Sequence, residues 1–142
     1  MKLNPEKCTF GVSSGKFLGY MITARGIEAD PSKIRAIQEM PRPRTKKQIM
    51  RLNGMLVAMN RFIAKASDRA RPLLQLLKKG SGFKWTDEYE RCFNDLKEYL
   101  LTPPVLASPV PSDILGLYLG VSEFAVSGVL FKDDNSIEKP IF

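Results

Sequence analysis

Two pairs of prolines divide the sequence into segments and so limit the helices that can form on either side of them. Pro41 and Pro43 stand two residues apart, and the dipeptide Pro103-Pro104 follows later. Because proline lacks an amide proton and its ring clashes with the preceding turn, a helix cannot continue through these positions. Asp30-Pro31 instead predicts a helix start, with the aspartate as N-cap and the proline in the first turn. The first helix is therefore expected over residues 31–40.

A longer helix is expected directly after the second of these prolines. Thr45 is a suitable N-cap, and Gln48 three residues later completes a capping box. Apolar residues then repeat at spacings of three and four, which places them on one helical face. They are Ile49, Leu52, Leu56, Met59 and Ile63. We therefore predict a helix over 45–65 whose apolar face packs in the core.

Two further helices and two β regions complete the expected elements. A leucine-rich helix within 67–79 ends at the Gly-Ser-Gly sequence of 80–82, and an acidic first turn after Thr86 starts another helix. A hairpin is expected over 8–23, with its turn at 13–15. Strands are also expected at 115–119 and 124–132, with a third beginning near Lys139. This order of elements predicts an α+β fold.

The charge distribution separates two parts of the chain at Trp85. Residues 1–85 contain 18 Lys and Arg against 5 Asp and Glu, whereas residues 86–142 contain 4 against 10. The basic part favours a polyanionic partner, most often nucleic acid, although a solvated surface without a partner has the same charge. With no histidine, the chain cannot form a Ser-His or Cys-His catalytic pair. No apolar run approaches the roughly 20 residues that cross a bilayer, so no membrane partner is expected.

Four cations and two small residues fall on the face of the 45–65 helix opposite its apolar stripe. At about 100° per residue, this face contains Lys47, Arg51, Arg61 and Lys65, with Gly54 and Ala58 between them. Such a ridge suits docking along a nucleic-acid groove, because glycine lets sugars approach the backbone and the cations pair with phosphates. The alternative is that Gly54 packs against another helix and the cations are merely solvated.

The first hairpin offers aromatic residues beside a glycine. Phe17, Gly19 and Tyr20 form this group. Such residues can support a nucleotide backbone or stack on a base, or they can simply form the core side of a strand.

Several short motifs follow one another in a specific order along nearly the whole chain. They lie at residues 3–8 (Leu-Asn-Pro-Glu-Lys-Cys), 17–20, 26–31, 52–54, 60–63, 83–86 (Phe-Lys-Trp-Thr), 117–119 and 125–130. In this order they resemble the Pol polyprotein of gypsy-type LTR retrotransposons, especially plant-type elements. The first three resemble the end of the reverse transcriptase palm, the next two its thumb, and the last three the start of the RNase H-like region.

The resemblance implies a palm hairpin over 1–29, a helical thumb over 30–80 and a truncated RNase H-like domain over 81–142. It also implies that the hairpin of Phe17, Gly19 and Tyr20 supports the primer strand, and that Gly54 faces the minor groove of the template-primer duplex. The partners that it implies are this duplex, RNA–DNA or DNA–DNA, and the remainder of the reverse transcriptase in an intact element.

The resemblance further implies that this chain contains neither catalytic centre. The polymerase carboxylates of the family, in its Tyr-x-Asp-Asp motif, precede the matched segment. The aspartate that holds magnesium on the first RNase H strand corresponds to Gly120, and the other ligands would lie beyond Phe142. No metal or other cofactor is therefore expected in this chain, and magnesium is expected only for the intact polyprotein. Asp133 and Asp134 are adjacent acids in an expected turn, where carboxylates are usually solvated.

Three functions remain for comparison. The leading hypothesis is a non-catalytic segment that binds the template-primer duplex and connects the polymerase to the RNase H-like region. The second is a free-standing regulatory DNA-binding protein that places the 45–65 helix in a major groove. That helix offers Lys, Arg, Gly and Ala, with Asn53 and Asn60 to one side, which favours backbone contacts over base reading. The third is an interaction scaffold without a nucleic-acid role.

Overall fold

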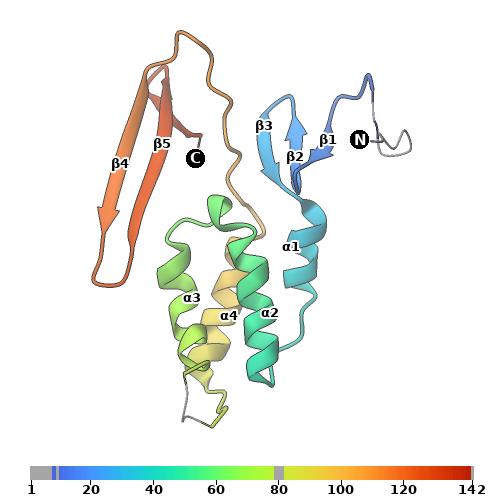
Figure 1. The fold of residues 1–142 in the computed structure, drawn as a ribbon, viewed down its shortest axis with the longest axis vertical. Coiled ribbons are helices and arrows are strands. Elements are labelled where there is room, and N and C mark those ends of the chain that lie inside the picture. Colours follow the sequence, from blue (N-terminus) through green and yellow to red (C-terminus); the bar gives the residue numbers. More distant parts are fainter. Residues whose placement is uncertain (1–7, 9, 79–81, 142) are drawn as a thin grey trace, which may run out of the picture.

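The computed structural model describes residues 8, 10–78 and 82–141. Its elements are β1 (Gly15–Phe17), β2 (Tyr20–Thr23), β3 (Gly26–Ala29), α1 (Pro31–Gln38), α2 (Lys46–Val57), the 3-10 helix η2 (Asn60–Phe62), α3 (Ala66–Gln75), α4 (Asp87–Tyr99), β4 (Leu115–Val121), β5 (Val126–Asp134) and β6 (Ile137–Pro140). The helices lie side by side, with β1–β3 above α1, while the β4–β5 hairpin lies at the upper left and its lower tip reaches down towards α3 (Figure 1). The predicted α+β fold is confirmed.

The N-terminal sheet has the antiparallel order β1-β2-β3, and its first turn differs from the prediction. The predicted turn at 13–15 is wrong, because the chain reverses at Leu18 and Gly19, whose φ angles are 49° and 81°. Two successive positive φ values match the twist of a tight hairpin. The predicted first strand over 8–12 is also wrong for its described residues, although Thr9 lies outside them. Strand β3 was not anticipated.

The predicted helix starts are confirmed, but the predicted 45–65 helix is not. The Asp30 carboxylate accepts a hydrogen bond from the Ser32 amide at 2.9 Å, and the Thr45 hydroxyl accepts one from the Gln48 amide at 3.3 Å. Helix α2 ends at Val57, and Lys65 adopts a left-handed conformation with φ of 53°. A residue in that conformation cannot continue a right-handed helix. The chain instead turns through η2, so that α3 packs against both α2 and α4.

All four helices contribute to one hydrophobic core. The apolar residues predicted for the core side of the second helix are all buried, being Ile49, Leu52, Leu56, Met59 and Ile63. Helix α4 adds Phe93 and Leu96 to the same core, and its C-cap residue adds Leu100. Most of the predicted helix stop at 80–82 falls outside the described residues. None of the helices in the described segments has the length and apolar character required to cross a bilayer.

The C-terminal sheet has the antiparallel order β4-β5-β6 and confirms the three predicted strands near 115–140. Leu117 lies opposite Leu130. Its second turn is formed by Asn135 and Ser136, which have positive φ values, so Asp133 and Asp134 lie on β5 and not in the turn as predicted. This sheet exposes many apolar side chains, including Leu119 at 73%.

Candidate nucleic-acid interface

A groove lies between α1 and α2 and has a volume of about 330 Å³. Its lining residues are Ser32, Lys33, Ala36, Arg51, Gly54, Met55 and Ala58. Gly54 and Ala58 are one helical turn apart. Because neither has a large side chain, the α2 wall of the groove does not block access to the helix backbone there. A Cβ added at Gly54 would meet no atom within 4 Å. Gly54 is therefore open to the groove and does not pack against another helix within the described part of the chain.

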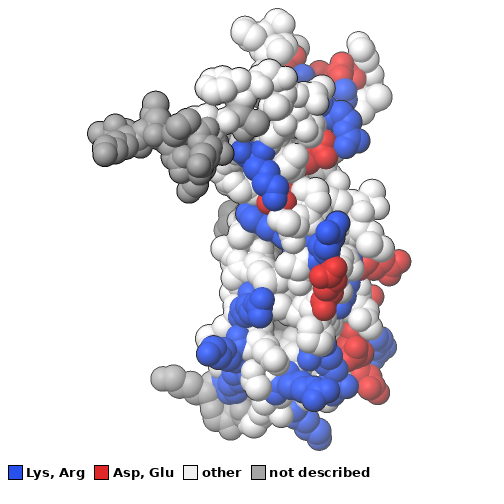
Figure 2. All heavy atoms as spheres, turned by 90° about the vertical axis from the view of Figure 1, so that its right-hand side faces the viewer, with Lys and Arg blue, Asp and Glu red and all other residues white. Residues whose placement is uncertain are grey.

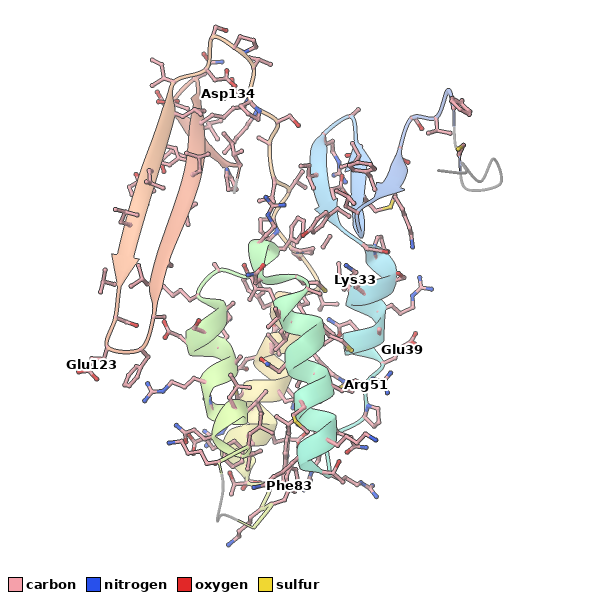
Figure 3. All side chains as sticks on the ribbon, in the orientation of Figure 1. Lys33, Glu39, Arg51, Phe83, Glu123 and Asp134 are labelled. Atoms are coloured by element: carbon pink, nitrogen blue, oxygen red, sulfur yellow. The ribbon has the colours of Figure 1, made fainter. Side chains whose placement is uncertain are left out.

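Each helix contributes a cation to the groove. Lys33 comes from the first turn of α1, and Arg51 comes from the middle of α2. Figure 3 shows Lys33 near the sheet end of the two helices and Arg51 farther from the sheet. Cations on both sides of a shallow apolar floor can contact two phosphate positions, while the floor accepts a sugar or base edge.

The β1–β2 turn adjoins this groove through Lys33. A Cβ added at Gly19 would lie only 2.8 Å from the Lys33 Nζ atom, which in turn lies 5.6 Å from the centre of the Tyr20 ring. Gly19 thus lets the turn approach the first turn of α1. The glycine is also favoured by its positive φ of 81°.

Tyr20 is held in place by its neighbours. Its ring centre lies 5.8 Å from that of Phe62, and the Arg61 guanidinium lies 5.6 Å from it. Lys33 and Arg61 thus both lie within cation–π range of the Tyr20 ring. Phe17, by contrast, is 63% exposed at the end of β1. Of the two predicted aromatic contacts, Phe17 is the one open to a ligand. The Tyr20 ring instead contacts the cations Lys33 and Arg61.

The structure brings together most, but not all, of the predicted site residues. Gly19, Tyr20 and Arg61 form one group around Lys33, which also lines the groove with Arg51 and Gly54. Lys47 and Lys65 do not line the groove. The predicted ridge assumed one straight helix, and that projection fails beyond Val57, where α2 ends. Lys65 instead directly precedes α3.

The α1 side of the groove was not predicted from the sequence. Ser32, Lys33 and Ala36 lie on α1 at spacings that place them on one helical face. This face contains a hydroxyl, a cation and a methyl group, a mixture with no clear apolar stripe. A projection of α1 alone would have grouped these residues, but only the packing of α1 against α2 identifies them as one wall of a groove.

Asp30 anchors the base of α1 beside this site. Burial opposes ionisation of Asp30, but hydrogen bonds from Ser32 and Lys16 together outweigh it and lower the pKa of the carboxyl. The Lys16 ammonium lies 3.0 Å from the carboxylate. Asp30 therefore links β1 to α1 without adding an unpaired negative charge to the groove.

The side of the molecule in Figure 2 displays Lys and Arg along its length, with Asp and Glu mostly towards one edge.

The residues present do not fit a magnesium site. Gly120 is exposed on β4 opposite Ser127 and has no side chain to bind a metal. The Asp133 carboxylate accepts a hydrogen bond from the Ser136 amide, and Asp134 forms an ion pair with Lys139. Across residues 8, 10–78 and 82–141, no three acidic or thiol side chains come together in a way that could hold a metal ion. No chemical step at a metal is therefore assigned to these residues.

Comparison with known proteins places this geometry in a protein class. Residues 85–142 match the model of the RNase H-like domain found in reverse transcriptase. The structure of the foamy viral protease-reverse transcriptase in complex with dsDNA superposes with a TM-score of 0.72 and 26% identity, over 92% of this chain and 27% of that one. The structure of the foamy viral protease-reverse transcriptase in complex with an RNA/DNA hybrid superposes with a TM-score of 0.73 and 25% identity. That match covers 91% of this chain and 18% of the other chain. The fold and the matched domain thus define a reverse transcriptase segment with an RNase H-like domain.

The relatives of known sequence narrow this class to polyproteins of transposons. The chain is 36% identical over 99% of its length to the Retrovirus-related Pol polyprotein from transposon opus of Drosophila melanogaster, and 33% identical over 99% to that from transposon 412. It is 32% identical over 90% of its length to the Transposon Tf2-3 polyprotein of Schizosaccharomyces pombe. The homologues of this chain are Pol polyproteins of Ty3/gypsy-type retrotransposons. It spans 15%, 11% and 10% of the lengths of these three relatives.

Proposed function

We propose that this chain binds the template-primer duplex of an RNA-directed DNA polymerase and connects the polymerase to the RNase H-like region. In this proposal residues 1–29 are the end of the palm, 30–80 the thumb and 81–142 the RNase H-like domain. The duplex backbone lies along the groove between α1 and α2. The chain itself catalyses no reaction.

The openness of Gly54 is the observation on which the proposal depends. A glycine within a helix costs about 0.5–1 kcal/mol relative to alanine. No neighbouring atom lies within 4 Å of the Cβ position of Gly54, so internal packing does not explain the glycine. A ligand that approaches the α2 backbone does explain it. The cations Lys33 and Arg51 at the same groove give that ligand a polyanionic character.

Three further observations support a duplex as this ligand. The solved relatives are reverse transcriptases in complex with dsDNA and with an RNA/DNA hybrid. The first 85 residues have a strong excess of Lys and Arg. The groove presents methyl groups, a backbone and cations, which read no base sequence and so suit a polymerase that must accept any template.

The regulatory DNA-binding alternative receives less support from the same geometry. It uses one basic helix over 45–65, whereas α2 ends at Val57 and the Arg61 guanidinium lies 5.6 Å from the Tyr20 ring centre. Asn53 on this helix is half-buried and so less available to base edges. A scaffold without a nucleic-acid role leaves the open glycine unexplained.

The experiment that tests the proposal fills the groove at Gly54. The whole chain is used, because α4 supplies part of the core around the proposed thumb. We expect Gly54→Leu to weaken binding of a labelled duplex at least tenfold, which corresponds to about 1.4 kcal/mol. The thermal midpoint should be unchanged or higher, since leucine is the better helix former.

Val57→Phe is the matched control, because it adds similar bulk to the same helix at a position that is 60% exposed and outside the groove. It should leave duplex binding unchanged. Equal loss of binding in both variants, or normal binding by Gly54→Leu, would contradict the proposed docking surface.

A further inference from the structure

A second cavity lies at the start of α2, beside the segment that leads into α4. It has a volume of about 410 Å³, and its lining residues are Arg42, Pro43, Arg44, Phe83 and Trp85. Figure 3 shows Phe83 at the end of the helical region that is farthest from the β1–β3 sheet. The cavity thus combines two arginines with two aromatic rings, away from the β1–β2 turn and Lys33.

The two rings form a stacked pair. The ring centres of Phe83 and Trp85 lie 6.3 Å apart, with an angle of 25° between the ring planes. Trp85 is further fixed by an edge contact with Phe93 and by a 2.7 Å hydrogen bond from its indole nitrogen to Glu90. Both rings are only half-buried, so part of each ring borders solvent. A fixed, partly exposed aromatic pair is a platform on which a flat ligand can stack.

The two arginines differ in how strongly they are engaged. The Arg42 guanidinium lies 5.6 Å from the Trp85 ring centre and 3.7 Å from the Glu90 carboxylate. Arg44 is exposed and has no ion pair with any residue that the structure describes. Arg44 therefore places a positive charge that Glu90 does not offset beside the aromatic platform.

We propose that this cavity binds an unpaired nucleotide of single-stranded nucleic acid. The base stacks on Phe83 and Trp85, and the adjoining phosphate pairs with Arg44. Stacking on aromatic side chains combined with cationic phosphate contacts is the general chemistry of single-strand binding. A paired base in a duplex cannot use this platform, because both of its faces are already covered by neighbouring base pairs.

The stacked rings favour a nucleotide over an acidic peptide as the occupant. An acidic peptide would use the arginines but gain little from two stacked rings. A nucleotide uses both features, since its base has a π-face and its phosphate has a negative charge. Gly54 lies eight residues after Lys46, the first residue of α2, which is about 12 Å along the helix at about 1.5 Å per residue, and the cavity residues on this side precede Lys46. The cavity is therefore a separate site from the duplex groove, and it does not depend on duplex binding there.

The single tryptophan makes the proposal directly measurable, because all tryptophan fluorescence comes from this cavity. We expect an oligothymidylate of eight nucleotides to quench Trp85 fluorescence in a saturable manner. An abasic strand of the same length has the phosphates without the bases and should cause little quenching. Phe83→Leu keeps an apolar side chain without the ring and should weaken oligothymidylate binding at least fivefold, the lower end of the stacking effect.

Arg44→Gln removes one exposed charge without altering the rings, so it is informative even if Phe83→Leu unfolds the chain. It should weaken oligothymidylate binding, whereas Arg25→Gln, which removes a charge on the distant β1–β3 sheet, should not. Duplex binding by Phe83→Leu and oligothymidylate binding by Gly54→Leu should both remain normal, which separates this site from the proposed duplex groove. Three results would overturn the inference: absence of quenching, equal quenching by a polyglutamate peptide, or equal effects of the Arg44 and Arg25 variants.

Discussion

Ile27 and Leu106 exchange two backbone hydrogen bonds, each 2.8 Å long, and so join strand β3 to the segment that follows α4. Leu106 is almost fully buried and belongs to the core formed by the helices. The bridge fixes the N-terminal sheet against the helical region. Because the β1–β2 turn contacts Lys33, this attachment also fixes the position of the turn beside the groove.

The first prediction concerns Gly26, which makes this bridge possible. Its φ of 136° is strained for other residues, and a Cβ would lie 2.2 Å from the Leu106 carbonyl oxygen. We expect Gly26→Ala to lower the free energy of unfolding by about 1–3 kcal/mol from backbone strain, with the clash adding to this. Urea denaturation followed by circular dichroism measures the change. Gly54→Ala is the matched control and should raise the free energy of unfolding by about 0.5–1 kcal/mol. If both variants changed the free energy of unfolding in the same direction, Gly26 would not be a strained, closely packed position and Gly54 an open one.

The second prediction concerns the salt dependence of duplex binding. If about four phosphates are neutralised, the slope of log K against log salt should be roughly −3 to −4. Fluorescence anisotropy of a labelled duplex between low and moderate salt measures the slope. Arg51→Gln removes one groove cation and should reduce the slope by about one unit. Binding that is insensitive to salt, or strongly selective for one sequence, would be inconsistent with phosphate contacts.

The third prediction concerns Asp30 and pH. Its lowered pKa means that the ionised carboxylate contributes stability above the unfolded pKa, near 4, and that this contribution is lost as pH falls through the folded pKa. Asp30→Ala should therefore cost about 1–2 kcal/mol at pH 7, mostly through loss of the helix cap. The difference from the parent chain should shrink below about pH 4. Glu39→Ala, at an exposed position at the other end of α1, should change stability little at either pH.

The fourth prediction is that this chain has neither polymerase nor RNase H activity with magnesium or manganese. Metal-assisted phosphoryl transfer needs carboxylates that converge on the ions. The described residues contain no such group. Primer extension and cleavage of an RNA–DNA hybrid are the assays. Gly120→Asp should remain inactive as well, because one carboxylate on β4 has no partner ligands nearby. Cleavage that follows the chain through orthogonal purification steps would show that the match of Gly120 to the metal position is misplaced.

Local signals in the sequence predicted the helix starts well. Asp30 and Thr45 cap helices as expected, since a cap depends only on residues within one turn. The apolar face from Ile49 to Ile63 is buried although its helix ends early, because the 3-10 helix keeps Phe62 and Ile63 turned towards the core. The end of α2 was not predicted, since no glycine or proline follows Val57. After this end the chain turns through η2, and α3 packs against α2 and α4.

The N-terminal turn and the groove could not be predicted from local sequence. The residues Ser13, Ser14 and Gly15 are stronger turn formers than Leu18, because leucine rarely adopts a positive φ. The later turn allows β2 to pair with both β1 and β3, and β3 also bridges to Leu106, which is distant in sequence. The groove likewise requires two helices to pack, so a projection of either helix alone shows only one wall. Lys33 was missed for this reason.

The shared core of the helices limits how this chain can be divided. Leu73 of α3 and Phe93 of α4 are buried in the same cluster, although they lie on opposite sides of the proposed boundary between residues 80 and 81. A protease that cuts the connection between α3 and α4 would therefore not release two independent domains. The two fragments would stay associated as a non-covalent complex, because each alone would expose its half of the core to water. The proposed boundary between thumb and RNase H-like domain thus runs through one shared hydrophobic core.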